Sequence, residues 1–123
     1  MRYILLMCLF YLMISCYNPE RNCEKFKTGT FEFEAYLNGD LQKTTFIRKD
    51  SIEIEIFNTK KDTAQIRWIN DCEYILKSKN PKSRSEKQPI HMKILSTTEN
   101  SYIFEYKIVG KTEKQKGRVV KVD

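Results

Sequence analysis

The cysteines are the residues whose type and spacing suggest the most definite chemistry in this chain. Four occur, at positions 8, 16, 23 and 72. Cys16 directly follows the small residue Ser15 at the end of an apolar run, which is the arrangement of a bacterial lipoprotein signal. In such a signal the cysteine is lipidated and becomes the first residue of the mature protein. The sequence therefore predicts lipidation at Cys16.

The segment before Cys16 has the composition of an export signal. Tyr3 to Ile14 form an uncharged apolar stretch of about 12 residues after one positive charge, within the ~7–15 of a secretory signal and short of the ~20 that span a bilayer. Met13 stands where lipoprotein signals prefer leucine, so plain secretion, or a cytosolic protein with a misleading start, is the alternative. We expect residues 1–15 to be removed and the protein to be membrane-anchored in the bacterial cell envelope. The outer membrane is favoured over the inner, and the periplasmic or surface orientation stays open.

Cys23 and Cys72 are predicted to form a disulfide. If Cys16 is acylated and Cys8 leaves with the signal, these two are an even pair in an oxidising compartment, where disulfides persist. The bond would close a loop of about 50 residues and contribute roughly 4 kcal/mol in the loop-entropy account. The alternative is two buried free thiols. No C-x-x-C spacing occurs, so the sequence supports neither a zinc site nor a thioredoxin-like redox motif.

Two carboxylate pairs could in principle supply a general acid and a general base. Glu32 with Glu34, and Glu53 with Glu55, each place two carboxylates on one face of a strand, about 7 Å apart. Both pairs alternate with apolar residues, so the pattern puts them opposite the buried face. We expect them to be solvent-facing and paired with lysines of neighbouring strands.

The single histidine, His91, gives little support to catalysis. Alternation places it on the face opposite Ile90, Met92 and Ile94, and no hydrolase, zinc-protease or phosphate-loop motif is present. The sequence predicts a surface or packing role for His91, and a non-enzymatic protein without a metal site or a cofactor.

The elements that position these residues are predicted to be β-strands. In Thr30–Leu37, Phe31 and Phe33 alternate with glutamates, which is the period of a half-buried strand. Asn38-Gly39 is a type I′ hairpin signal. Further strands are expected at 41–48, 52–56, 63–69, 72–77, 90–95, 101–109 and 117–122, with turns at 49–50 and 58–62.

Short connections between about eight strands favour an all-β antiparallel meander. Closing it into a small barrel removes the exposed edges, and a strongly curved half-barrel or a two-sheet sandwich is the alternative. After the N-terminal signal segment, 16–25 is expected to be the lipidated cysteine with a short tether, and 26–123 a single β-domain.

Charge and aromatic content suggest two further candidate sites. The chain carries a net charge of +6, and the segment from Lys77 to Lys87 lacks apolar residues. This candidate loop for an anionic partner comprises Lys77, Lys79, Lys82, Arg84 and Lys87. We expect an anionic lipid or glycan, or an envelope protein, as its partner; the alternative is a solvated loop without a partner. Nucleic acid is not expected, because no aromatic residue interleaves with the charges and the signal directs export.

Aromatic residues form the second candidate site. The expected strands carry six that would line a ligand cavity if the barrel were hollow: Phe31, Phe33, Trp68, Tyr102, Phe104 and Tyr106. An eight-stranded barrel is either filled by its side chains or holds one small ligand. With about 108 mature residues and many large inward side chains, the filled core is favoured over the hollow one.

Three segments resemble a family of small bacterial envelope lipoproteins of unknown function. They are Cys16–Cys23, Phe26–Phe31 and Arg67–Tyr74, the last with a Trp-x-x-x-Cys-x-Tyr pattern. The resemblance covers nearly the whole chain and implies an envelope location but no residue-level activity. Some members carry a DNA topoisomerase IV label, which a chain of this length, with an export signal and no phosphate-binding loop, does not support.

At the level of topology, the expected barrel is similar to lipocalin-like barrels. This resemblance implies carriage of a small hydrophobic ligand as the alternative to a structural or interaction role. Fold alone does not decide between the two.

Overall fold

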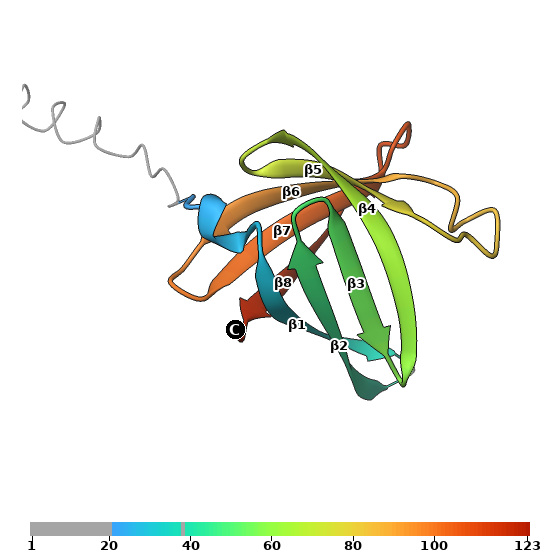
Figure 1. Cartoon of the computed structure of the whole chain (residues 1–123), viewed down its shortest axis with the longest axis horizontal. Coiled ribbons are helices and arrows are strands. Elements are labelled where there is room, and N and C mark those ends of the chain that lie inside the picture. The colour runs from blue at the N-terminus through green and yellow to red at the C-terminus, as the bar shows by residue number, and fades with distance from the viewer. Residues whose placement is uncertain (1–20, 38) are drawn as a thin grey trace, which may run out of the picture.

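Alternating side chains along eight consecutive strands build a closed antiparallel barrel in the computed structural model, which describes residues 21–37 and 39–123. Each strand pairs with the next, and β1 closes the barrel against β8 (Figure 1). The strands are β1 Gly29–Leu37, β2 Asp40–Lys49, β3 Ile52–Phe57, β4 Lys60–Asn70, β5 Glu73–Ser78, β6 Ile90–Thr97, β7 Ser101–Ile108 and β8 Gln115–Lys121. The predicted all-β meander is confirmed, and it closes as a barrel.

The turn between β3 and β4 is tighter than the sequence suggests. Asn58 and Thr59 both have positive φ, 46° and 69°, as a two-residue hairpin turn requires. β4 therefore begins at Lys60 and runs through the positions expected to extend the turn to Asp62. At the β1–β2 hairpin Gly39 has a φ of 85°, while Asn38 and the predicted signal and lipidation site at 1–16 lie outside the described residues.

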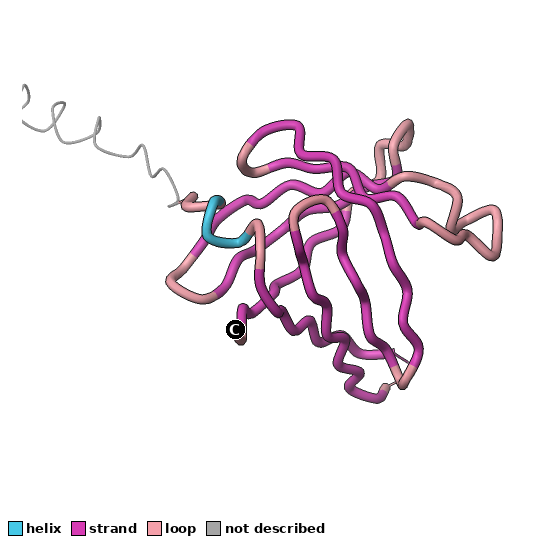
Figure 2. Tube along the Cα trace, viewed as in Figure 1, coloured by secondary structure: helices cyan, strands magenta, loops and turns pink. Residues whose placement is uncertain are grey.

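The two ends of the barrel differ, because η2, a short 3-10 helix at Glu24–Phe26, covers only one of them. We call this the closed end; it also holds the β2–β3, β4–β5 and β6–β7 turns (Figure 2). Cys23 is joined to Cys72 here with a Cα–Cα distance of 5.3 Å, the predicted pairing. Cys23 and η2 thus pack on the barrel, although 16–25 was expected to be tether.

The opposite end has no covering helix among the described residues, and we call it the open end. It holds the β1–β2, β3–β4 and β7–β8 connections and the long loop between β5 and β6, which projects at the right of Figure 1.

The core lies in the closed half and is largely aromatic. Phe26 and Phe31 are fully buried, and Tyr102 contacts both rings edge-on at centroid distances of 5.2 and 6.1 Å. Further along the interior, Gly117 of β8 makes room for two rings. A Cβ at this position would lie 2.6 Å from Phe104 and 2.9 Å from Phe33.

The sequence prediction for the faces of β3 is wrong. Glu53 was expected on the solvent face but is only 8% exposed, and the alternating isoleucines lie on the other face, half-buried. The cause is the register. Glu53 lies opposite Arg48 and Glu55 lies opposite Phe46, which itself lies opposite Phe31 of the core. Residues directly opposite each other share a face of the sheet, so both glutamates of β3 are on the inner face. Glu53 is buried there, whereas Glu55, nearer the open end, is exposed to solvent as predicted.

The other carboxylate pair behaves as predicted. Lys43 of β2 places its Nζ 3.6 Å from Glu32 and 3.7 Å from Glu34 on the neighbouring strand. These side chains are partly exposed, so the pairing adds only a few tenths of a kcal/mol.

Candidate functional site

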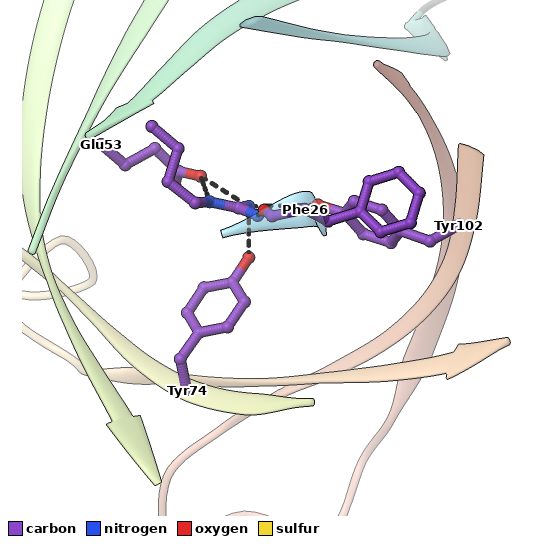
Figure 3. Close-up of polar contacts among 5 residues, drawn as sticks. Phe26, Glu53, Tyr74 and Tyr102 are labelled. Atoms are coloured by element: carbon purple, nitrogen blue, oxygen red, sulfur yellow. Dashed lines mark hydrogen bonds and ion pairs between the residues drawn. The ribbon is translucent and has the colours of Figure 1, made fainter. Parts of the chain in front are cut away.

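A buried guanidinium lies in the closed half of the barrel, beneath η2. Arg48 of β2 is 1% exposed, and its Nη2 donates to Glu53 Oε1 at 3.0 Å. The same nitrogen donates to the hydroxyl oxygens of Tyr74 and Tyr102 at 2.8 and 3.1 Å, and Nη1 donates to the carbonyl of Phe26 at 2.6 Å. Figure 3 shows Glu53, Tyr74 and Tyr102 reaching the interior from different walls of the barrel, with Phe26 of η2 between them.

Aromatic faces complete the surroundings of Arg48. Its guanidinium carbon lies 4.8 Å from the ring centroid of Phe31 and 4.9 Å from that of Tyr74, within the range of cation–π attraction. Among the described residues, no buried side-chain nitrogen or oxygen lacks a hydrogen-bond partner. The charge in the closed half is therefore fully satisfied by protein groups.

Burial and charge shift the pKa values of this cluster. Burial raises the pKa of both Tyr74 and Tyr102 despite the nearby Arg48, so both phenols stay protonated. Burial opposes the charge of Arg48, but Tyr74, Tyr102 and Glu53 together raise its pKa above the ordinary value. The cluster is thus one ion pair with two neutral phenols.

The open half of the barrel contains a cavity of about 270 Å³, which we call the inner cavity. Its wall is mostly aromatic and aliphatic, with two carboxylates. The lining residues are Phe33, Thr44, Phe46, Glu53, Glu55, Tyr74, Leu76, Ile90, Met92, Tyr102, Phe104, Tyr106 and Val119.

A second space of about 210 Å³, which we call the mouth, adjoins the inner cavity. The two share four wall residues: Glu53, Glu55, Leu76 and Ile90. Ser85, Glu86 and Gln88 of the β5–β6 loop complete the mouth together with residues of β3, β4 and β5. The two spaces therefore lie next to each other on either side of these four side chains.

The mouth is strongly acidic in a chain that is basic as a whole. Glu53, Glu55, Asp62 and Glu86 line it, and no lysine or arginine of the described chain does. Glu55 and Asp62 lie directly opposite each other across β3 and β4. Partial burial, and then the charges of Glu53 and Asp62, raise the pKa of Glu55.

Four of the six aromatic residues predicted to line a cavity do so: Phe33, Tyr102, Phe104 and Tyr106. The other two lie in the closed half. Phe31 is fully buried and stacks on Phe46 at 5.1 Å, and Trp68 packs against Tyr74 at 4.7 Å beneath Lys27. The interior is thus filled in one half and hollow in the other, whereas the sequence favoured a filled core.

The basic residues singled out in the sequence are all exposed at the open end. Lys77 belongs to β5, and the other four lie in the loop that follows it: Lys79, Lys82, Arg84 and Lys87. None of the five forms an ion pair with another residue in the described part of the chain.

His91 lies on the outer face of β6, opposite Ile90, Met92 and Ile94 as predicted, with its Nε2 3.3 Å from Glu73 of β5. A hydrogen bond from Asn70 lowers the pKa of Glu73, so this carboxylate is ionised beside the imidazole at neutral pH. The pair is on the outer surface of the barrel, where Lys93, Glu105 and Lys107 lie around it.

The sequence reasoning missed Arg48, the acidic mouth and the role of the β5–β6 loop in forming it. Arg48 carries no motif, because its significance depends on partners from β3, β5, β7 and η2. One signal was available. The two-residue turn between β2 and β3 sets Lys49 opposite Ile52, so even-numbered residues of β2 lie opposite odd-numbered residues of β3. If Phe46 points into the barrel, Glu53 and Glu55 must therefore point inward as well.

Comparisons with protein-family models, with curated proteins and with solved structures found no match to this chain. Within residues 21–37 and 39–123, no cluster of three or more histidine, cysteine, aspartate or glutamate side chains is arranged to hold a metal ion. The same residues contain no helix that is long and apolar enough to cross a membrane.

Proposed function

We propose that this protein is a lipid-anchored envelope protein whose barrel binds a small, largely hydrophobic molecule. The inner cavity is the observation that carries the proposal, because an eight-stranded barrel with a filled core would leave no such space. Aromatic and aliphatic walls with a few polar groups are typical of small-molecule sites.

The size of the cavity limits the ligand. About 270 Å³ is close to the lower end of the ~300–1,000 Å³ range of ligand pockets. A cavity of about 150 Å³ already accommodates benzene. A single ring with a short chain fits these dimensions, whereas a long acyl chain would have to extend out through the mouth.

A binding role is better supported than a catalytic one. The buried ion pair of Arg48 and Glu53 is used internally, and the nearby phenols of Tyr74 and Tyr102 are held protonated. A role as a carrier, receptor or scavenger needs only the cavity and its opening.

The binding proposal can be tested by filling the cavity. Thr44 lines the inner cavity, whereas Thr45, next to it on β2, lies opposite Ile56 on the outer face. We expect Thr44→Trp to abolish saturable calorimetric binding of small aromatic compounds, and Thr45→Trp to retain it. Equal binding by both variants, or none by the parent protein, would contradict the proposal.

The anchor is a separate part of the proposal and rests on the Ser15-Cys16 signal. Intact mass spectrometry of protein extracted from host membranes should give residues 16–123 plus acyl chains. Cys23 and Cys72 should be alkylated only after reduction. A Cys16→Ser variant should lose the acyl mass. An unprocessed chain starting at Met1 with free thiols would contradict the proposed lipid anchor, and it would leave the test of the cavity unaffected.

A second candidate function is contact with an anionic glycan through Lys79, Lys82, Arg84 and Lys87, supported by their exposure and lack of ion pairs in the described structure. The loop is at the open end, whereas the chain reaches the barrel at the closed end, so the loop points away from the anchoring side. Changing all four residues to Gln should weaken retention on an anionic polysaccharide column, and unchanged retention would dismiss this role.

A further inference from the structure

The walls of the two adjoining spaces differ in chemistry, and this difference restricts the ligand. The inner cavity is bounded by rings such as Phe33, Phe104 and Tyr106, while the mouth is bounded by carboxylates. A molecule that fills both must place an apolar body inside and a polar group at the mouth. The side chains of Glu53, Glu55, Leu76 and Ile90 border both spaces.

The carboxylates at the mouth are not balanced by the protein's own cations. Glu53 has Arg48 as its partner, but the exposed carboxylates of Glu55 and Asp62 form no ion pair and no side-chain hydrogen bond with another described residue. Like charges directly opposite each other across two strands are destabilising. The chain has 22 lysines and arginines, yet none lines either space in the described structure.

We propose that the natural ligand of the cavity is an organic cation: an amine or quaternary ammonium group on a compact apolar or aromatic body. This inference rests on the proposed binding function and assigns its ligand class. The ammonium group would lie at the mouth between Glu55 and Asp62, with Glu53 and Glu86 nearby, and the body would lie among Phe33, Phe104 and Tyr106.

Three aspects of the geometry favour this ligand over others. A cation relieves the repulsion between Glu55 and Asp62, whereas a fatty acid would add a further negative charge. The faces of nearby aromatic rings also attract ammonium groups. A divalent metal ion fits less well, because the carboxylates at the mouth do not converge as metal ligands in the described structure.

The test compares three probes that share one body and differ only in head group: 4-phenylbutylamine, 4-phenylbutan-1-ol and 4-phenylbutyrate. The full protein, purified from host membranes into neutral lipid nanodiscs, is titrated calorimetrically with empty nanodiscs as the blank. We expect the amine to bind about tenfold more tightly than the alcohol, and the carboxylate most weakly. Added salt should weaken the amine alone.

Two matched variants separate the charge at the mouth from the net charge of the protein. Glu55→Gln should reduce amine affinity by about tenfold and leave the alcohol unchanged. Glu34→Gln, on the outer face of β1, removes the same charge and should leave all three affinities unchanged.

The outcomes distinguish the two proposals. If the alcohol binds at least as tightly as the amine, or Glu34→Gln acts like Glu55→Gln, the cation inference is overturned while the binding function stands. If none of the three probes binds saturably, both are overturned.

Discussion

The closed and open halves of this barrel treat charge in opposite ways. In the closed half, Arg48 is almost wholly buried, and every hydrogen-bond partner comes from the protein itself. In the open half, Glu55 and Asp62 face each other at the mouth with no protein cation between them. The comparison shows that the surroundings of each charged residue, and not the fold as a whole, decide whether its charge is paired within the protein. The half with internal partners stabilises the fold, and the half without them is the one to which we assign ligand binding by proposal.

The largest loss of stability is expected when the buried cation of the closed half is removed. Arg48→Leu leaves Glu53 buried without its partner, and we expect the free energy of unfolding to fall by about 3–5 kcal/mol. The measurement is urea denaturation followed by circular dichroism. In the double variant Arg48→Leu/Glu53→Leu the loss should be smaller, because the uncompensated charge is gone. A double variant less stable than the single one would show that the ion pair is not the main cause.

The next largest loss of stability is expected when the disulfide at the closed end is removed. Replacing Cys23 and Cys72 by Ala should lower the free energy of unfolding by about 2–4 kcal/mol, because the unfolded chain is no longer constrained. Thermal unfolding of the variant should match that of the parent protein under reducing conditions. Ligand binding at the open half should persist well below the melting temperature. Loss of binding at those temperatures would mean that the two halves are coupled.

A substitution at Gly117 tests where the packed half of the barrel ends and the hollow half begins. Gly117→Ala places a methyl group against the rings of Phe104 and Phe33, and overpacking of this kind costs about 1–3 kcal/mol. Since both rings border the inner cavity, they have room to yield, and we expect a loss of about 1 kcal/mol with weaker ligand binding. Lys116→Ala, at the neighbouring exposed position of β8, is the control and should change neither quantity. If the free energy of unfolding fell by about 3 kcal/mol and ligand affinity did not change, Phe104 and Phe33 would belong to the rigid core.

The smallest effect concerns the pH dependence of the open half. The pKa of Glu55 is higher in the barrel than in the unfolded chain, so the folded state holds the proton more strongly. Stability therefore falls as the pH rises from about 4.3, the ordinary value of a glutamate, through the raised value. Glu53, Asp62 and Glu86 are the neighbouring acids that line the same space.

Glu55→Gln removes the loss of stability that ionisation of Glu55 causes. We expect its melting temperature to match that of the parent protein near pH 4 and to exceed it by ~1–4 °C at pH 7. A melting temperature at pH 7 below that of the parent would show that the Glu55 carboxylate has a stabilising partner.

Much of the architecture could be predicted from the sequence, because it depends on local patterns. Alternation in Thr30–Leu37 and in the segment from Ser101 onward identified strands whose phenylalanines do face inward. The pairing of Cys23 with Cys72 followed from the parity of cysteines in an oxidising compartment. These features need no knowledge of which strands are neighbours across the barrel.

The site could be predicted only in part, because it depends on non-local register. In Ile52–Phe57 the alternation is clear, but hydrophobicity alone chose the wrong face. Isoleucines tolerate a half-buried outer surface, and Glu53 is tolerated inside because Arg48 lies opposite. The hollow half depends on side-chain volumes summed over most of the strands, which no short segment reveals.

The disulfide also determines how the barrel bears mechanical load. A pull on the chain upstream of Cys23 passes through the covalent bond to Cys72, between β4 and β5, as well as along the backbone into β1. Force is thereby divided between two walls of the barrel and does not peel β1 away from β8 one hydrogen bond at a time. Force applied upstream of Cys23 would therefore load β4 and β5 together with β1.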